Sequence, residues 1–288
     1  MSINIVKYTF KYVLVNKPSG IACEGYGAHS LLPQVTKFFK LLRPEAPLDP
    51  KRFKLVQRLD RYVTGGMIVS RDEKFTKKMN KALAKKEANL LLTRRYVGLL
   101  GLVFDDNSLS SGTITYDVAS LERDLKRSNA DGQLLVNHAS STRFKILHHL
   151  KRVPTGPQVQ KYPELYESKV LYPIIYELDT GRKNQLRDHT QNAFGTTLLN
   201  DDAFTQFKLF LATKVLANST AYKSNQIGLH SAYVKLVQGG NVKEEALIPV
   251  HVAEDRELWT GFTEENGDFV AEIQRELVEF TNENGKSS

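Results

Sequence analysis

The chain has 288 residues, of which 41% are hydrophobic and 25% are charged, a composition typical of a folded globular protein. Its longest apolar run, residues 97–104, contains two glycines and falls far short of the roughly 20 residues of a membrane-spanning helix. Cys23 is the only cysteine, which excludes an internal disulfide and any C-x-x-C motif and fits a reducing compartment.

The net charge of +8 is spread unevenly along the chain. Residues 1–100 carry +13, residues 101–240 carry +3, and residues 241–288 carry −8. Without its acidic C-terminal section the body attracts polyanions, and each phosphate contact adds to a salt-dependent affinity. RNA, DNA or an anionic membrane each satisfies this pattern, and a solvated lysine-rich surface without any partner explains it equally well.

Short β-type segments separated by Gly, Pro, Asn and Asp predict an extended, largely antiparallel sheet. The expected strands are residues 12–16, 67–70, 96–104, 113–118, 142–147, 170–178 and 232–237. Loops are expected at residues 33–50, 128–133 and 154–163. No segment has the composition of an interdomain linker, so the sequence favours a single catalytic domain over residues 1–288.

Two segments have helical periodicity. Residues 72–88 place an apolar side chain at every fourth position from Phe75, with lysines on the remaining faces, which predicts a helix with a basic outer surface. Residues 268–280 repeat the pattern, and Asp268 is the predicted N-cap. Because this second helix is acidic, we expect it to lie away from any bound nucleic acid.

Familiar catalytic motifs are missing from the sequence. It contains no G-x-x-x-x-G-K-[ST], G-x-G-x-x-G, G-x-S-x-G or H-E-x-x-H motif, and no Cys/His cluster with metal-ligand spacing. These absences disfavour nucleotide hydrolysis, dinucleotide redox chemistry and metal catalysis. We therefore expect neither a cofactor nor a metal.

A carboxylate between two cations precedes a tight turn in residues 57–66, Q-R-L-D-R-Y-V-T-G-G, which lead into the apolar segment M-I-V-S. Asp60 lies between Arg58 and Arg61, and nearby positive charge favours the ionised carboxylate. Such a carboxylate can act as a nucleophile or a base. From these residues alone, a surface ion pair at the start of a strand is the alternative.

Two further segments combine cations with groups that bind or stack. Residues 94–100, R-R-Y-V-G-L-L, place Tyr96 after two arginines, where the phenol can stack on a base and relay a proton, or simply pack in the core. Residues 178–189, L-D-T-G-R-K-N-Q-L-R-D-H, gather polar and basic side chains at a predicted helix N-terminus. That arrangement suits an anion or a base edge, and a charged turn is the alternative.

In this order, the three segments resemble the RluA-type family of RNA pseudouridine synthases. The family pattern is approximately H-R-L-D-x-x-T-S-G, then K-x-Y, then L-x-T-G-R-x-H-Q-[IL]-R-x-H. Residues 13–20 match its earlier N-K-P strand, and residues 228–232 match its late L-H-A segment. The departures concern the fit of the substrate rather than the reaction, and they are Gln57 for His, Val63 for Thr, Thr64 for Ser, Arg94 for Lys and Asn184 for His.

The resemblance implies an α+β pseudouridine synthase fold with a large mixed, mostly antiparallel central sheet flanked by helices and loops, and no N-terminal S4 domain. It also implies isomerisation of uridine to pseudouridine in structured RNA, a reaction that needs no cofactor. Asp60 would be the catalytic aspartate, acting either by covalent attack or through a glycal-like intermediate. Tyr96 would stack on the uracil and help to move its C5 proton, and Arg187 would hold Asp60.

Arg58 would enter the stack where the flipped base leaves it, and the other expected substrate contacts are Arg182, Gln185 and Leu229, with Ile227 as a further apolar wall.

The partner is expected to be rRNA rather than tRNA, with no membrane contact and a monomeric state. The divergent motifs and the missing S4 domain resemble the fungal or organellar branch of the family. A mitochondrial location is therefore expected, with the cytoplasm as the alternative.

Residues 1–23 contain no acidic residue, which superficially resembles a mitochondrial presequence, but residues 12–16 already form a predicted core strand. A presequence would therefore be very short or uncleaved.

Two other functions compete with this interpretation. A catalytically silent RNA-binding or ribosome-assembly factor on the same fold explains the basic body but not the joint presence of Asp60, Tyr96 and Arg187. A glycosidase is disfavoured, because Asp60 has no second acid in a comparable motif and a basic surface does not suit a neutral sugar.

Overall fold

The computed structural model describes residues 3–25, 27, 29–45, 50–85, 90–102, 111–123, 133–201 and 226–281. Within them, ten strands form one sheet in the order β1-β2-β4-β11-β5-β10-β9-β6, with β3 beside β4 and β12 beside β11. The strands of this sheet are β1 (Asn4–Tyr8), β2 (Tyr12–Lys17), β3 (Lys54–Leu55), β4 (Thr64–Ser70), β5 (Leu90–Leu102), β6 (Ser111–Thr115), β9 (Ser141–Ile146), β10 (Val170–Leu178), β11 (Leu229–Gln238) and β12 (Asn241–Leu247). The hairpin of β7 (Val118–Arg123) and β8 (Gln133–His138) forms a separate pair.

The described strands pair antiparallel, except that β11 runs parallel to β4 over two residue pairs. This confirms the predicted mixed, mostly antiparallel sheet. The segment expected at 113–118 is divided between β6 and β7, and β1, β3, β8 and β12 were not predicted. Residues 103–104 of the expected strand and 128–132 of the expected loop lie outside the described residues, and residue 133 begins β8.

The helices are α1 (Leu31–Leu42), α2 (Glu73–Lys85), α3 (Gly156–Lys161), α4 (Pro163–Tyr166), α5 (Gln185–Phe194), α7 (Ala253–Arg256) and α8 (Ala271–Glu279), with 3-10 turns η1 (Pro50–Arg52), η2 (His148–Leu150) and η3 (Glu257–Trp259). No helix in the described part of the chain is long and apolar enough to cross a membrane.

The prediction of a loop at residues 33–50 was wrong for its first half, which belongs to α1. Pro33 lies in the first turn of this helix, where the backbone N–H groups have no partner within the helix, so a proline is tolerated. Leu31, Val35 and Phe39 recur every fourth residue and are buried against the sheet. Proline thus marked the start of an amphipathic helix rather than a loop.

Two other boundaries also differ from the prediction. Within the expected loop at 154–163, α3 begins with a capping box, in which the Thr155 hydroxyl accepts a hydrogen bond from the Gln158 backbone N–H. The C-terminal helix starts at Ala271 with Val270 in the N-cap position, so the assignment of Asp268 as N-cap was wrong. The Asp268 carboxylate instead accepts a hydrogen bond from Asn266 in the preceding turn.

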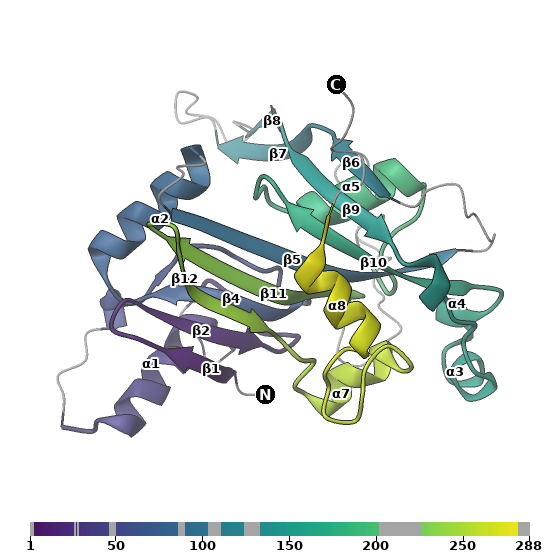
Figure 1. Cartoon of the computed structure of the whole chain (residues 1–288), viewed down its shortest axis with the longest axis horizontal. Coiled ribbons are helices and arrows are strands. Elements are labelled where there is room, and N and C mark those ends of the chain that lie inside the picture. Colours follow the sequence, from purple (N-terminus) through teal and green to yellow (C-terminus); the bar gives the residue numbers. More distant parts are fainter. Residues whose placement is uncertain are drawn as a thin grey trace.

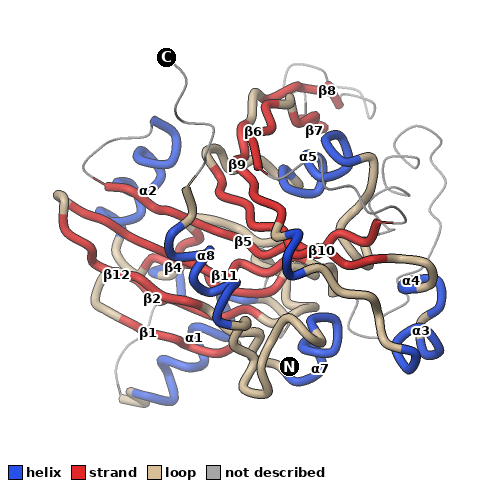
Figure 2. The backbone as a smooth tube through the Cα atoms, turned by 45° about the vertical axis from the view of Figure 1, so that its right-hand side comes forward, coloured by secondary structure: helices blue, strands red, loops and turns tan. Residues whose placement is uncertain are grey.

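The central strands bury both faces, as their alternating side chains show. On one face, Tyr96 and Leu100 of β5 pack with α1 and with Leu186 of α5. On the other face, Val97 and Leu99 of the same strand pack with α8, α4 and η3. Figure 1 shows α8, in yellow, lying across β11, β5 and β10, and Figure 2 shows the same arrangement from another side.

Helix α2 covers a third cluster, in which Phe75 and Met79 contact β2, β4, the N-terminal half of β5 and the C-terminal half of β11. The helix confirms the predicted periodicity and ends at Lys85, beyond which residues 86–89 are not described. It lies beside the start of β5 in Figure 1, and its Asn80, Leu83 and Ala84 reach the pocket described below.

The start of β4 approaches β11 so closely that only glycine fits at position 65. Gly65 has φ of +110°, and a Cβ there would lie 2.4 Å from the Ser231 carbonyl oxygen. This close approach explains the first glycine of the Thr-Gly-Gly sequence. The pairing of β4 with β11 holds the loop that carries Asp60 next to β11.

Candidate active site

A pocket of about 920 Å³ opens on the Tyr96 face of the sheet. Its walls come from the loop before β4, from β5, from α2 and from the turn between β10 and α5. The predicted site residues Arg58, Asp60, Tyr96, Arg182, Gln185, Arg187 and Leu229 all line it. Residues distributed over the chain from position 58 to 229 therefore meet in one place.

The loop that carries Asp60 is fixed from behind by residues 17–23. Lys17 is fully buried, and its ammonium donates hydrogen bonds to the carbonyl oxygens of Pro18, Ile21 and Arg61 at 3.2, 2.9 and 3.0 Å. Burial lowers the pKa of Lys17 to about 8. The Gly20 N–H also donates to the Arg61 carbonyl, and the Arg61 Nε donates back to the Gly20 carbonyl.

Cys23 provides a second attachment for the same loop. Its thiol donates to the Leu59 carbonyl at 3.1 Å, and the Leu59 N–H donates to the sulfur at 3.3 Å. Burial raises the pKa of this thiol. Leu59 and Arg61, the two neighbours of Asp60, are thus held by residues 17–23. The N-K-P motif and the residues after it therefore have a structural role.

Asp60 accepts a hydrogen bond from Arg187 Nη1 at 3.2 Å and keeps about a third of its side chain exposed to the pocket. Arg187 is held in turn by Asp201, whose two oxygens bind Nε and Nη2 at 2.8 and 2.7 Å. Burial acts to lower the pKa of Arg187, but the bonds to Asp201 and the charge of Asp60 outweigh it and raise that pKa. The guanidinium therefore stays charged and directs one edge at Asp60.

Sequence reasoning missed Asp201. The residue is almost fully buried and lies 14 positions after Arg187, at the end of a segment with no motif of its own. The only sequence signal is a pair of adjacent aspartates at 201–202 in an otherwise basic section.

Tyr96 and Arg94 project from β5 on the pocket side, two residues apart. Burial raises the pKa of Tyr96, and the charge of Arg94 acts in the opposite direction without cancelling it. The phenol is therefore protonated at neutral pH. Leu229 provides an apolar part of the wall, while Ile227, which was expected beside it, is buried in the core and does not line the pocket.

The turn before α5 is built around Gln185. This side chain is a predicted substrate contact, but its amide makes four hydrogen bonds within the protein, to Ser141 O, Thr142 Oγ1, Thr180 Oγ1 and the Arg182 N–H, at 2.9–3.0 Å. Gln185 thereby fixes the turn that presents Arg182 and Lys183 to solvent at the rim. Arg58 is also exposed at the rim, where it pairs with Glu24 at 2.9 Å.

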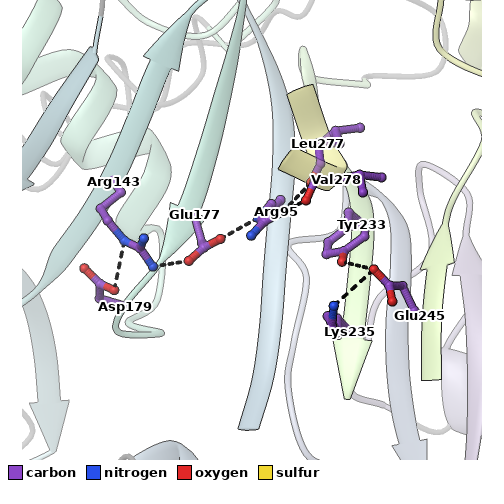
Figure 3. A network of polar contacts seen from close by, with 9 residues as sticks. All are labelled: Arg95, Arg143, Glu177, Asp179, Tyr233, Lys235, Glu245, Leu277 and Val278. Carbon is purple, nitrogen blue, oxygen red and sulfur yellow. Dashed lines mark hydrogen bonds and ion pairs between the residues drawn. The ribbon is translucent and has the colours of Figure 1, made fainter. Parts of the chain in front are cut away.

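Arg95, the neighbour of Arg94 in β5, lies on the opposite face of the strand and does not line the pocket. It pairs with Glu177 of β10, which also binds Arg143, and it donates hydrogen bonds to the carbonyl oxygens of Leu277 and Val278 at the end of α8 (Figure 3). Successive strand residues point to opposite faces, so two adjacent arginines cannot serve the same pocket. The acidic α8 accordingly packs on the face away from Asp60.

A buried polar layer lies behind the Asp60 loop. His230 Nδ1 is 2.7 Å from the Thr64 hydroxyl, and its Nε2 is 3.0 Å from the Ile248 carbonyl oxygen. Burial lowers the pKa of His230 to about 4. Asp255 accepts a hydrogen bond from the Ser19 N–H, and burial raises the pKa of this carboxyl to about 6. The L-H-A histidine is thus part of the support of the loop.

The chain belongs to the RNA pseudouridylate synthase family, because the family model with that description matches residues 11–192. It is therefore an RNA pseudouridine synthase, an isomerase that acts on uridine in RNA.

Curated relatives cover nearly the whole chain. The 21S rRNA pseudouridine(2819) synthase of Candida albicans is 40% identical over 259 residues, which are 90% of this chain and 100% of that protein. The protein of the same name from Saccharomyces cerevisiae is 27% identical and aligns with 93% of this chain and 92% of its own.

Two solved structures share the fold. Human RNA pseudouridylate synthase domain-containing protein 4 superposes with a TM-score of 0.56 at 16% identity, covering 88% of this chain and 92% of that one. The corresponding human protein 1 gives 0.56 at 15% identity, with 97% and 96% covered. These similarities confirm the predicted pseudouridine synthase fold.

Proposed function

We propose that this enzyme modifies mitochondrial large-subunit rRNA at the uridine that corresponds to position 2819 of 21S rRNA. The observation that carries the proposal is the alignment with the Candida albicans protein of that name, which extends over all of that protein at 40% identity. A 21S rRNA is mitochondrial, so the proposed location is the mitochondrion. The basic body of the chain supports recruitment of an RNA. A monomer is proposed, as the family resemblance favours.

Asp60 is the proposed catalytic carboxylate. The reaction breaks the bond between N1 of uracil and C1′ of the ribose, rotates the base, and joins C5 to C1′. The proton lost from C5 is balanced by the one gained at N1, so no co-reactant is consumed. Asp60 either bonds to the substrate or removes a ribose proton to give a glycal, and both routes need an ionised carboxylate that points into the pocket. The bond from Arg187, itself clamped by Asp201, supports that role.

Tyr96 is the proposed surface on which the detached uracil turns, because its ring lines the pocket with Leu229 and its phenol is neutral. The enzyme must first remove the uridine from its stack, which costs a few kcal/mol. Arg58 is exposed at the rim, where a side chain can fill the vacated space. Arg182, which is also exposed at the pocket, is proposed to bind the RNA backbone.

The test is to map pseudouridine with carbodiimide labelling in mitochondrial rRNA and tRNA from cells with and without the protein, and in rRNA transcripts incubated with the purified enzyme. One labelled uridine in the large-subunit rRNA should depend on the protein and appear in the transcript. Modification of tRNA alone would overturn the rRNA assignment. If a folded, RNA-binding protein formed no pseudouridine in any of these RNAs, the silent binding factor would replace the enzyme.

A further inference from the structure

Arg94 is a buried cation whose charge has no counterpart in the part of the chain that the structure describes. Only 7% of the residue is exposed, and its Nε is buried without a hydrogen-bond partner. No hydrogen bond or ion pair joins the guanidinium to any described residue. A buried charge without a partner is costly, so this arrangement needs a reason other than stability.

The carboxylates that line the pocket are already engaged. Asp60 binds Arg187, Glu24 pairs with Arg58, and Asp179 accepts a hydrogen bond from Ser141 and pairs with Arg143. None of the described residues thus supplies an anion that neutralises Arg94, and a ligand can supply it.

The sequence leaves room around the tip of this side chain. A Cβ at position 181 would lie 3.2 Å from Arg94 Nη1 and 3.4 Å from Nη2, so glycine allows the guanidinium to lie against the turn before α5. Arg94 shares the pocket lining with Asp60 and Tyr96. A planar guanidinium with free N–H groups is well suited to bind a phosphate through two hydrogen bonds.

We propose that Arg94 binds a phosphate that directly flanks the target uridine once the nucleotide has entered the pocket. RNA supplies one negative charge per nucleotide, and the flipped nucleotide brings its own phosphates to the pocket. The proposal rests on the function proposed above, and it adds a substrate-binding residue at a position where the sequence departs from the K-x-Y pattern.

Stability and activity are expected to move in opposite directions when Arg94 is changed. Because the free protein gains nothing from the buried charge, the Tm of Arg94→Met should equal or exceed that of the wild type, while its turnover falls. The neighbouring Arg95 is paired with Glu177 and the end of α8, so Arg95→Met should lower the Tm. A marked fall in the Tm of Arg94→Met would assign Arg94 to the fold instead.

The decisive experiment combines the variant with a modified substrate. The probe is a synthetic RNA that spans the uridine corresponding to position 2819, made with a neutral methylphosphonate at the 5′ or the 3′ flanking phosphate. Arg94→Gln should lower the single-turnover rate at subsaturating enzyme by about 10- to 100-fold on unmodified RNA, and Arg94→Lys should recover part of it. One methylphosphonate should slow the wild type similarly, but should slow Arg94→Gln by about twofold or less.

Arg143→Gln is the matched control, since it removes one arginine charge from the opposite face while Glu177 keeps Arg95. It should retain the full methylphosphonate effect. Equal methylphosphonate effects in the wild type and in Arg94→Gln would overturn the assignment of Arg94. An unmodified probe that the wild type does not convert, although the protein modifies another RNA, would instead overturn the proposed substrate, so the two failures are distinguishable.

Discussion

Asp60 and Arg187 come from segments 127 residues apart in the sequence, yet one hydrogen bond joins them in the pocket. Each side chain is also held from behind, Asp60 through the backbone of its two neighbours and Arg187 through Asp201. Positioning of this kind keeps the carboxylate in one orientation before the RNA arrives, which removes an ordering cost from the reaction.

Replacement of the proposed catalytic carboxylate tests the site most directly. Asp60→Asn removes the charge but keeps the shape, so pseudouridine formation should fall by at least about 1000-fold while the Kd for RNA changes by no more than about threefold. Single-turnover assays and filter binding on the same RNA measure the two quantities. Appreciable residual turnover by the purified variant would remove Asp60 from the catalytic role.

Tyr96→Phe deletes only the phenol oxygen. If that oxygen helps to move the C5 proton, the single-turnover rate should fall by about 100-fold with little change in affinity, because the ring that stacks on uracil is retained. Tyr96→Leu, which also removes the ring, should lower both the single-turnover rate and the affinity for RNA. An unchanged rate for the phenylalanine variant would leave Tyr96 as packing.

Asp201 is expected to matter for both stability and turnover, although it does not line the pocket. Asp201→Asn removes one of the two carboxylates that pair with the largely buried Arg187, so the free energy of unfolding should fall by about 3 kcal/mol. Turnover should fall by about 10- to 100-fold, because Arg187 is freer to move. Urea unfolding and single-turnover assays measure the two effects, with Asp268→Asn in the turn before α8 as the control. Unchanged turnover would separate Asp201 from the site.

At the scale of the elements, the buried polar layer between β2, β11 and α7 carries motif residues that do not touch the pocket. Thr64 and His230 bond to each other across the only parallel pairing among the described strands, and Lys17 reaches the carbonyl of Arg61. These side chains join elements far apart in the sequence behind one loop. Motif positions of this kind hold the backbone behind the pocket.

The raised pKa of Asp255, about 6 compared with an ordinary value of 3.8, predicts a dependence of stability on pH. Between these values the folded protein binds a proton that the unfolded chain has released, so this group lowers stability as pH rises, and the full cost is present above about pH 6. Asp255→Asn should therefore raise the free energy of unfolding at pH 7 by up to about 3 kcal/mol, and the Tm with it. The difference from the wild type should vanish as pH falls to 4. Thermal melts from pH 4 to 7.5 measure it, and a difference independent of pH would contradict the assignment.

At the scale of the whole molecule, the sheet separates the charges. The basic α2 borders the pocket, while the acidic α8 packs across the other face of β5 and β10 (Figure 1). The lysine-rich helix and the acidic C-terminal helix therefore lie on different surfaces, and the lysine-rich one borders the pocket. Residues of α2, Arg58 and Arg182 line the pocket, whereas no residue of the C-terminal helix does.

Salt dependence distinguishes the two faces. Lys81 lies on α2 next to Asn80 of the pocket lining, and Lys81→Gln should weaken RNA binding a few-fold and reduce the slope of log K against log salt by about one. Glu272→Gln on α8 should leave both quantities unchanged. Titrations at several salt concentrations measure the slopes, and equal effects of the two variants would remove α2 from the RNA-binding surface.

Segments with strong local patterns could be predicted from the sequence. The continuous runs of β-type residues in β2 and β10 and the four-residue repeat of α2 specified those elements, because each pattern lies within a few consecutive residues. The four-residue repeat in α1 is equally local, but Pro33 was taken as a loop signal. The short strands β1 and β3 have little pattern of their own and exist through their partners.

The sequence by itself determined the chemistry, since the order and spacing of three motifs brought Asp60, Tyr96 and Arg187 into one hypothesis without any contact being known. Only the tertiary structure decided how these groups are held. The clamp of Asp201 on Arg187, the buried Lys17 behind Asp60, and the division of Arg94 and Arg95 between opposite faces all depend on which strands pair and in which register. Those choices follow from long-range packing of the sheet, and no local spacing records them.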